Sequence, residues 1–297
     1  MSDTAIVRIG SGSLSAAFAL RGAELWSLLL DGEERLWHGD PAWWDYRAPL
    51  LFPVIGRSID ETVTVQDRPF PMPLHGFARD LPFAVAEVSD DRVTLVQASD
   101  AATLGMFPFD YRLTVEAWVD GTTLGMSSTV ENMSGRPMPF CFGYHPGFMW
   151  ADDASERARF VCRFGHAEDA PVRRARMATG LLLSEREPCP VAGRTLALHD
   201  GLFTRGSIQF ERLHSRSVWF GRPGGTGLTV TFPDSPHLGI WTRPGAPFLC
   251  IEPWQGFAAE EGGSPELALR PGAMVLEPGA TKTFPLAVTF GTADPGA

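Results

Sequence analysis

The chain has 297 residues, of which 44% are hydrophobic and 20% are charged, and its formal net charge is -10. This composition is typical of a soluble globular protein, and the negative charge argues against a nucleic-acid partner. Lys282 is the single lysine among 25 Lys and Arg residues, which argues against Schiff-base catalysis.

Strands with one buried face are predicted wherever apolar residues alternate with others along the chain. In chain order, this alternation covers residues 113–119, 124–130, 228–232 and 284–290. Asp120-Gly121 predicts a hairpin turn between the first two segments, and Gly224-Gly225 predicts a turn before the third. Long helical patterns and a repeat of fixed period are absent from the sequence. The chain is therefore predicted to be all-β, a large antiparallel β-sandwich that forms a single domain over residues 1–297.

Residues 152–193 interrupt this pattern and include a cluster of arginines, Arg173, Arg174 and Arg176. Two interpretations of this stretch stay open, an insertion or lid over a site and a solvated excursion of the surface. The irregular and charged character of the segment favours the surface excursion.

The four cysteines, Cys141, Cys162, Cys189 and Cys250, lack the C-x-x-C spacing of a zinc or redox site. Cys141 and Cys250 have apolar neighbours and are interpreted as small buried side chains in a reducing compartment. The sequence has no stretch of membrane-spanning length and no targeting pattern near its first residues. We therefore expect a cytoplasmic protein, monomeric or homodimeric, with no membrane or nucleic-acid partner.

Ionisable side chains stand among aromatic residues, glycines and prolines in three separate segments. Residues 74–80 contain His75 and Arg79, residues 140–148 contain His145, and residues 249–256 contain Glu252. A histidine in such a setting can exchange a proton near neutral pH while an aromatic face covers a ring. Either histidine could equally be a core residue satisfied by a backbone carbonyl.

Glu252 and Arg57 add opposite charges to this set. Glu252 follows an apolar run and precedes Pro253, so its carboxylate is interpreted either as an ion-paired structural group or as a tuned base. Arg57 closes the apolar run 48–56, where a guanidinium can hold hydroxyls, a carboxylate or a phosphate. Together with the histidines, these residues suggest an acid/base site for a neutral polar substrate.

Five short motifs, taken in order, resemble those of the aldose 1-epimerase (galactose mutarotase-like) superfamily. They are GAEL at 22–25, FPVIGR at 52–57, LHGFAR at 74–79, GYHPGF at 143–148 and IEPW at 251–254. The resemblance runs from about residue 6 to residue 290. It implies the large antiparallel β-sandwich of that superfamily, with a sugar site on one sheet face, and an isomerase that uses no cofactor and no metal.

The resemblance also implies a role for each matched residue. His145 corresponds to the general acid and Glu252 to the general base, and the residues expected to bind the sugar are His75, Arg57, Arg79 and Trp254. The base removes the proton of the anomeric hydroxyl while the acid protonates the ring oxygen. The ring then opens, the aldehyde carbon rotates, and closure reverses both proton transfers.

The chain departs from many hexose mutarotases at Gly56, where they have asparagine, and at Phe77, where they have glycine. Their sugar-binding aspartate has no clear counterpart, and Asp200 is a candidate.

A free aldose ranks first as the substrate. The alternatives are a hexose-6-phosphate 1-epimerase, a non-catalytic sugar-binding or sensing protein and, last, a glycoside hydrolase or lyase. A hydrolase normally needs two carboxylates, and only Glu252 stands out.

Overall fold

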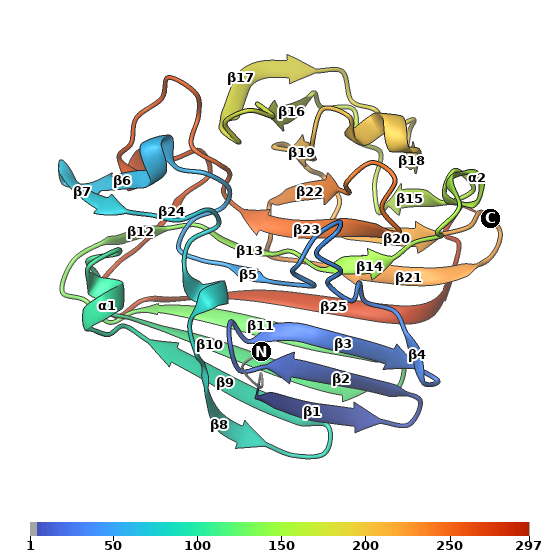
Figure 1. Ribbon diagram of the computed structural model, residues 1–297, viewed down its shortest axis with the longest axis horizontal. Coiled ribbons are helices and arrows are strands. Elements are labelled where there is room, and N and C mark those ends of the chain that lie inside the picture. The colour runs from blue at the N-terminus through green and yellow to red at the C-terminus, as the bar shows by residue number, and fades with distance from the viewer. Residues whose placement is uncertain (1–4, 297) are drawn as a thin grey trace.

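The structure is a computed structural model that describes residues 5–296, and most of its regular elements are β-strands (Figure 1). Every pair of named strands among these residues is antiparallel. Two large sheets dominate, and three smaller ones lie around them. The predicted all-β fold is confirmed.

The nine-stranded sheet forms the base of the molecule. Its strands, in spatial order, are β18 (Thr195–Ala197), β15 (Val161–Phe164), β20 (Ser217–Gly221), β21 (Thr226–Thr231), β25 (Thr281–Ala293), β11 (Thr123–Asn132), β10 (Tyr111–Asp120), β9 (Arg92–Ala98) and β8 (Ala84–Val88). The four segments in which alternation predicted strands correspond to β10, β11, β21 and β25. Apolar residues of these strands alternate between buried and less buried positions, as the period of two requires.

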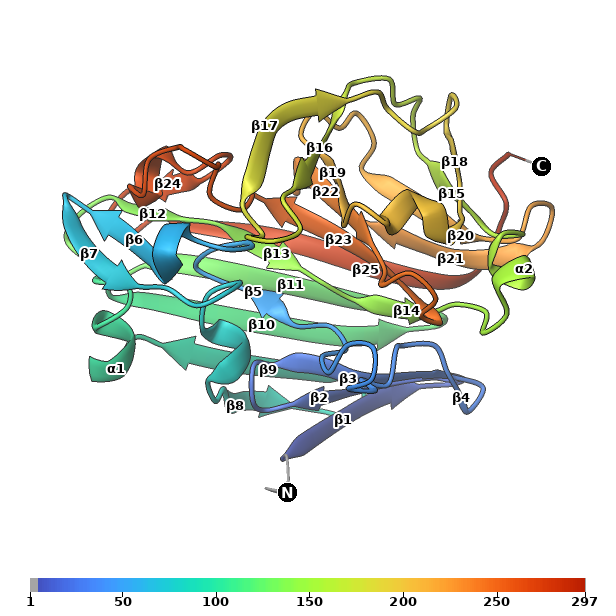
Figure 2. The same ribbon diagram turned by 45° about the horizontal axis from the view of Figure 1, so that its top comes forward.

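The eight-stranded sheet lies over this base and carries the candidate site (Figures 1 and 2). Its strands, in spatial order, are β17 (Leu182–Glu187), β16 (Val172–Ala175), β19 (Ile208–Phe210), β22 (His237–Trp241), β23 (Phe248–Gln255), β13 (Phe142–Tyr144) and β5 (Leu50–Leu51), and β14 (Gly147–Met149) also pairs with β23. The β16–β17 hairpin stands at the upper edge of this sheet in both views.

The remaining elements are short. A four-stranded sheet contains β1 (Ile6–Ser11), β2 (Leu14–Ala19), β3 (Glu24–Leu30) and β4 (Glu33–Glu34), and two further pairs are β6 (Thr62–Val65) with β7 (Arg68–Pro71) and β12 (Met138–Phe140) with β24 (Met274–Leu276). The helical segments are α1 (Ala101–Leu104), α2 (Ala154–Arg157), η1 (Ile59–Glu61), η2 (Ala78–Asp80), η3 (Asp200–Phe203) and η4 (Leu267–Leu269). Within residues 5–296, no helix has the length and apolar character needed to cross a membrane.

The predicted hairpin turn at Asp120-Gly121 is present. Asp120 pairs with Thr123, which leaves a two-residue loop between β10 and β11. Gly121 has φ 57°, a left-handed conformation that glycine adopts without a steric penalty. Local turn chemistry therefore fixes the register of the longest hairpin of the base sheet.

The core lies between the two large sheets. The Tyr144 hydroxyl on β13 donates to the Phe284 carbonyl of β25 at 2.7 Å and is hydrogen-bonded to the Ser128 hydroxyl of β11 at 2.8 Å. Phe142 stacks on Phe284 with ring centroids 4.8 Å apart. These contacts hold the site-bearing sheet directly above the longest strands of the base, so apolar burial makes the site floor rigid.

Residues 152–193 are more regular than the surface excursion favoured from sequence. β15 is an internal strand of the nine-stranded sheet, between β18 and β20, and its Cys162 is fully buried. β16 and β17 extend the eight-stranded sheet. The surface interpretation was wrong because β15 and β16 have only four residues each and their buried positions do not alternate, so no period of two could be recognised.

Candidate active site

The sheet register places His145 opposite Glu252. β13 pairs with β23 at Gly143 and Trp254, and β14 pairs with β23 at Gly147 and Cys250. Counting inward from either pair brings residue 145 level with residue 252. Residues directly opposite each other in an antiparallel pair project from the same face of the sheet. The two predicted catalytic side chains therefore meet although 107 positions separate them along the chain.

The row continues across the other side of β23. Glu252 pairs with Gly239 of β22, Gly239 pairs with Gln209 of β19, and Gln209 pairs with Arg173 of β16. These positions share one face of the sheet. Gly239 has no side chain, so the row of polar groups has a gap beside the glutamate.

The imidazole and the carboxylate are in direct contact. His145 Nε2 lies 3.0 Å from Glu252 Oε2, and the two residues are 6% and 1% exposed. Among residues 5–296, no group hydrogen-bonds to His145 Nδ1 or to Glu252 Oε1. Buried polar atoms without a partner are costly in a folded protein, and they are typical of sites that a ligand completes.

Trp254 lies flat across the floor of the site. A Cβ atom at Gly143 would come within 2.5 Å of its indole, and one at Gly239 within 2.6 Å. Any larger residue on either neighbouring strand would displace the ring. These two glycines, of which Gly143 belongs to a sequence motif, thus provide room for an aromatic surface, which suits the C–H face of a sugar ring.

His75 is held as a neutral hydrogen-bond donor. Its ring Nδ1 accepts the Gly56 backbone N–H at 3.0 Å, and the His75 backbone N–H donates to the Gly56 carbonyl at 3.0 Å. Burial, followed by the nearby charges of His145 and Arg79, lowers the pKa of His75 well below its usual value. Because Nδ1 accepts, the proton of the neutral ring is assigned to Nε2, which is then a donor.

The loop between β4 and β5, which bears Trp44, covers one side of the His145 imidazole. The Trp44 ring lies against His145 with centroids 4.8 Å apart and planes tilted by 31°, and Trp241 meets the same imidazole edge-on at 5.8 Å. The loop is anchored at its base by Glu24, whose carboxylate accepts the backbone N–H groups of Arg47 and Ala48. The GAEL motif therefore has a structural role, since its glutamate fixes the loop that bears Trp44.

These groups line a cavity of about 390 Å³. Its lining residues include His75, His145, Glu252, Trp254 and Arg79, together with the side chains of Trp44, Asp45, Tyr46, Gln209 and Trp241. This volume and the mixture of aromatic surface with a few polar groups are typical of small-ligand sites. Five of the six residues predicted to form the site are therefore gathered in one cavity.

Arg79 lies in the cavity wall with most of its side chain buried. Its guanidinium carbon lies 4.4 Å from the centroid of the Tyr46 ring, and its Nε lies 3.7 Å from a carboxylate oxygen of Asp80. Asp80 also accepts hydrogen bonds from Arg21 and from the Tyr46 hydroxyl. Asp80 thus lies between two arginines and offsets the charge of Arg79 only in part.

Arg57 and Asp200 are placed differently. Arg57 is absent from the described cavity lining, although it adjoins Gly56 there, and its guanidinium pairs with Glu61 at 2.9 Å. Asp200, the candidate for the sugar-binding aspartate, pairs with Arg157 at 2.8 Å and likewise lines no part of the described cavity. Arg157 is the main cause of the lowered pKa of Asp200.

Gln209 lines the cavity but was not identified as a site residue from the sequence. It is 4% exposed, its Nε2 donates to Ser207 Oγ at 3.0 Å, and its Oε1 has no hydrogen-bond partner in the described part of the chain. Nothing in the run Ser207-Ile208-Gln209 distinguishes it from an ordinary strand. Its importance follows from cross-strand register, which no local pattern encodes.

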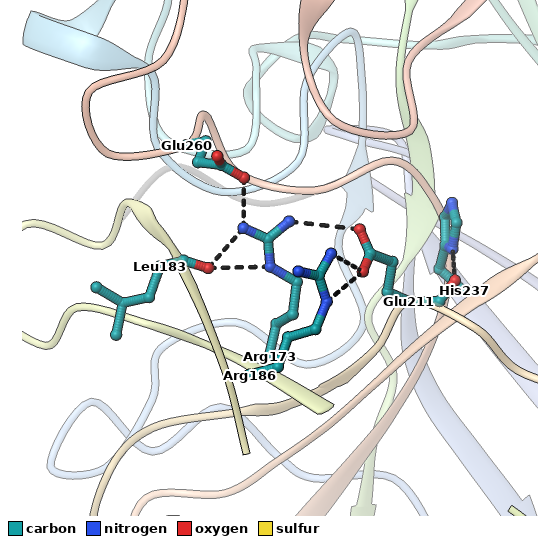
Figure 3. A network of polar contacts seen from close by, with 6 residues as sticks. All are labelled: Arg173, Leu183, Arg186, Glu211, His237 and Glu260. Atoms are coloured by element: carbon teal, nitrogen blue, oxygen red, sulfur yellow. Dashed lines mark hydrogen bonds and ion pairs between the residues drawn. The ribbon is translucent and has the colours of Figure 1, made fainter. Parts of the chain in front are cut away.

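An arginine network lies next to Gln209, because Arg173 pairs with Gln209 across the sheet. Figure 3 shows the contacts of this network. Arg173 donates to the Leu183 carbonyl and to Glu260, and lies 3.4 Å from Glu211, which also pairs with Arg186 at 2.7 Å. Its side chain is 3% exposed. Of the arginines that suggested a charged surface segment, Arg173 is thus buried inside this network, and Arg186 from β17 joins it half-exposed.

The fold and the site together define a large antiparallel β-sandwich with a buried imidazole–carboxylate pair in a cavity on one sheet. The model of the family described as aldose 1-epimerase matches residues 5–289. The chain belongs to the aldose 1-epimerase family.

Individual relatives agree with this assignment. Protein LacX (chromosomal) of Lactococcus lactis subsp. lactis is 33% identical over 288 residues, which cover 92% of this chain and 93% of that protein. A galactose mutarotase-like protein from Lactobacillus casei ATCC 334 has a TM-score of 0.90 at 31% identity, covering 96% and 99% of the two chains. A galactose mutarotase related enzyme from Lactobacillus acidophilus has a TM-score of 0.88 at 25% identity, covering 98% and 99%.

Proposed function

We propose that this protein is an aldose 1-epimerase that interconverts the α and β anomers of a free aldose. The contact between His145 and Glu252 carries the proposal. Ring opening requires a proton to leave the anomeric hydroxyl and another to reach the ring oxygen, and both oxygens are bonded to the same carbon. An acid and a base for this reaction must therefore lie side by side, and the 3.0 Å separation meets that requirement.

Each residue has a distinct part in the proposed reaction. Glu252 starts ionised and accepts the hydroxyl proton, and His145 starts protonated and donates to the ring oxygen. The open-chain aldehyde then rotates about its C1–C2 bond, and closure from the other side returns both protons. His75 Nε2 donates to a sugar oxygen, Gln209 Oε1 accepts from a hydroxyl, and Trp254 supports the ring face.

The charge distribution supports an uncharged sugar over a sugar phosphate. A phosphate is normally bound by cationic groups that are free to form paired hydrogen bonds. Here Arg57 pairs with Glu61, Arg79 has Asp80 beside it, and the cavity lining includes the carboxylates of Asp45 and Glu252. Hexose-6-phosphate 1-epimerase activity and sugar sensing without catalysis remain the alternatives that the assay below separates.

The test is anomer exchange measured by NMR or polarimetry in excess of the buffer rate. With Glu252→Gln or His145→Asn, we expect this excess rate to fall at least about 100-fold, because positioned proton transfer contributes that much or more. Glu168→Gln is the matched control, since Glu168 is also buried but accepts backbone N–H groups of residues 214 and 215. Its activity should equal that of the wild type.

Several outcomes would contradict the proposal. Full activity of either site variant would show that the pair is not the acid and base. Exchange of glucose 6-phosphate without exchange of glucose, galactose or other free aldoses would favour the phosphosugar enzyme. Saturable sugar binding with no excess rate for any aldose would favour a sensor.

A further inference from the structure

Three side chains that commonly bind metal ions meet beside the cavity, and two of them, His145 and Glu252, line it. One potential ligand atom each from His145, Cys250 and Glu252 lies within 4.8 Å of the other two, and all three residues are buried. Cys250 and Glu252 are two positions apart on β23, so they project from the same face. The spacing of cysteines in the sequence gives no sign of this cluster, because the third donor comes from another strand.

The chemistry of this donor set selects a particular class of ion. A thiolate, an imidazole and a carboxylate suit Zn²⁺ and related divalent ions, whereas Mg²⁺ and Ca²⁺ prefer oxygen ligands. His145 Nδ1 and Glu252 Oε1 also lack hydrogen-bond partners among residues 5–296, and their residues are more than nine-tenths buried. The cluster therefore has buried polar atoms without partners in addition to the right donor types.

We propose that His145, Cys250 and Glu252 form a three-ligand site for Zn²⁺, with the fourth position open to the cavity, and that the bound ion blocks the sugar. The inhibitory part rests on the proposed function, because the ion occupies the imidazole and carboxylate that would otherwise move protons. The binding part does not depend on it. Three protein ligands with one open position is an arrangement that zinc commonly adopts.

Binding requires a modest adjustment of the side chains. Tetrahedral zinc with ordinary bond lengths places its ligand atoms about 3.5 Å apart, so donors that lie up to 4.8 Å apart must draw together by about 1 Å. A zinc–sulfur bond forms as the Cys250 S–H proton leaves to solvent, and the protonated His145 of the proposed reaction also releases one ring proton to solvent before that nitrogen binds the ion. Cys250 packs in an apolar cluster with Trp37, Ala246 and Phe248, so the ion approaches from the cavity side, which His145 and Glu252 line.

The direct test uses Co²⁺ as a spectroscopic substitute for zinc. Titrating the purified, metal-free protein should give an intense near-ultraviolet band from thiolate-to-cobalt charge transfer at one ion per chain, and Zn²⁺ should abolish it. Cys250→Ala and Cys250→Ser should both lose the band while retaining the wild-type circular dichroism. Cys189→Ala is the control, because Cys189 is the most exposed of the four thiols and should not contribute.

The activity test is separate from the spectroscopic one. Zn²⁺ should raise the apparent KM for the aldose in the wild type, and a chelator should restore it. Cys250→Ala should retain metal-free activity but need at least about tenfold more zinc for the same inhibition, since loss of a ligand costs at least as much as loss of a supporting group.

Loss of the cobalt band in Cys189→Ala, or its persistence in Cys250→Ala, would overturn the site. A protein without turnover that still shows the Cys250-dependent band would refute the proposed function alone.

Discussion

Single residues determine whether the cavity can perform proton transfer. In the proposed reaction His145 and Glu252 supply the acid and base, and that reaction depends on neighbours that keep other groups uncharged or in place. His75 is such a neighbour, since the Gly56 N–H occupies its Nδ1 and burial lowers its pKa. The proposed reaction therefore uses one histidine that exchanges its proton and one that only donates, although the two imidazole centroids lie only 5.6 Å apart.

Gln209 provides a prediction at this scale. Gln209→Leu removes a buried acceptor that we expect to bind a sugar hydroxyl, so KM should rise about five- to a hundredfold while kcat changes less. Steady-state anomer exchange over a range of sugar concentrations measures both. Gln97→Leu is the matched control, because Gln97 is buried and bonds Tyr111 outside the described cavity lining. Equal KM values for the two variants would remove Gln209 from the site.

At the scale of elements, the site depends on segments that are held by a few polar anchors. Arg270 is the clearest example. Its guanidinium donates to the carbonyls of Ile55, Arg57 and Phe257 and to Ser58 Oγ. Burial lowers its pKa to about 10, so it stays charged at neutral pH. It thereby fixes the segment that includes Gly56, which in turn holds His75.

Arg270→Met should therefore destabilise the protein. Three backbone carbonyls would lose a charged donor, at a cost of about 3 kcal/mol or more in the free energy of unfolding. Chemical denaturation measures this cost. Arg112→Met is the control, because Arg112 forms an exposed pair with Glu131 that should contribute less than about 1 kcal/mol. A similar small effect for both variants would show that the 55–58 segment does not need its anchor.

On the scale of the whole molecule, burial within the sandwich makes the free energy of unfolding depend on pH. His75 and His237 both have a lowered pKa, chiefly through burial. Once the pH falls below the unfolded value of 6.5, the unfolded chain binds protons that the native protein does not. The contribution of these two neutral histidines to the free energy of unfolding is thus intact above that pH and is lost progressively below it. Buried Glu24, with a raised pKa, acts in the opposite direction at more acidic pH.

We therefore expect the free energy of unfolding to be lower at pH 5.5 than at pH 7.5. In His75→Asn this difference should shrink, because one of the two groups that resist protonation is gone. Denaturant unfolding of both proteins at the two pH values tests the expectation. An identical difference in wild type and variant would show that His75 is protonated as readily in the native protein as in the unfolded chain.

The composition and local order of the chain determined its all-β class, its longest strands and its hairpin turn. Alternation and turn residues act over a few neighbouring positions, so the sequence expresses them directly. The motifs around His75, His145 and Glu252 also marked these residues as candidates, because ionisable groups among glycines and aromatic residues are conspicuous. Trp44 and Tyr46 stood in an aromatic run that could have been noticed.

Tertiary structure alone decided which groups meet. Register across β19, β22 and β23 placed Gln209 in line with Glu252, and it brought Cys250 to His145. It also placed Arg57 against Glu61 and Asp200 against Arg157, outside the described cavity lining. Pairing between distant strands depends on the packing of the complete sheet, which local sequence patterns do not encode.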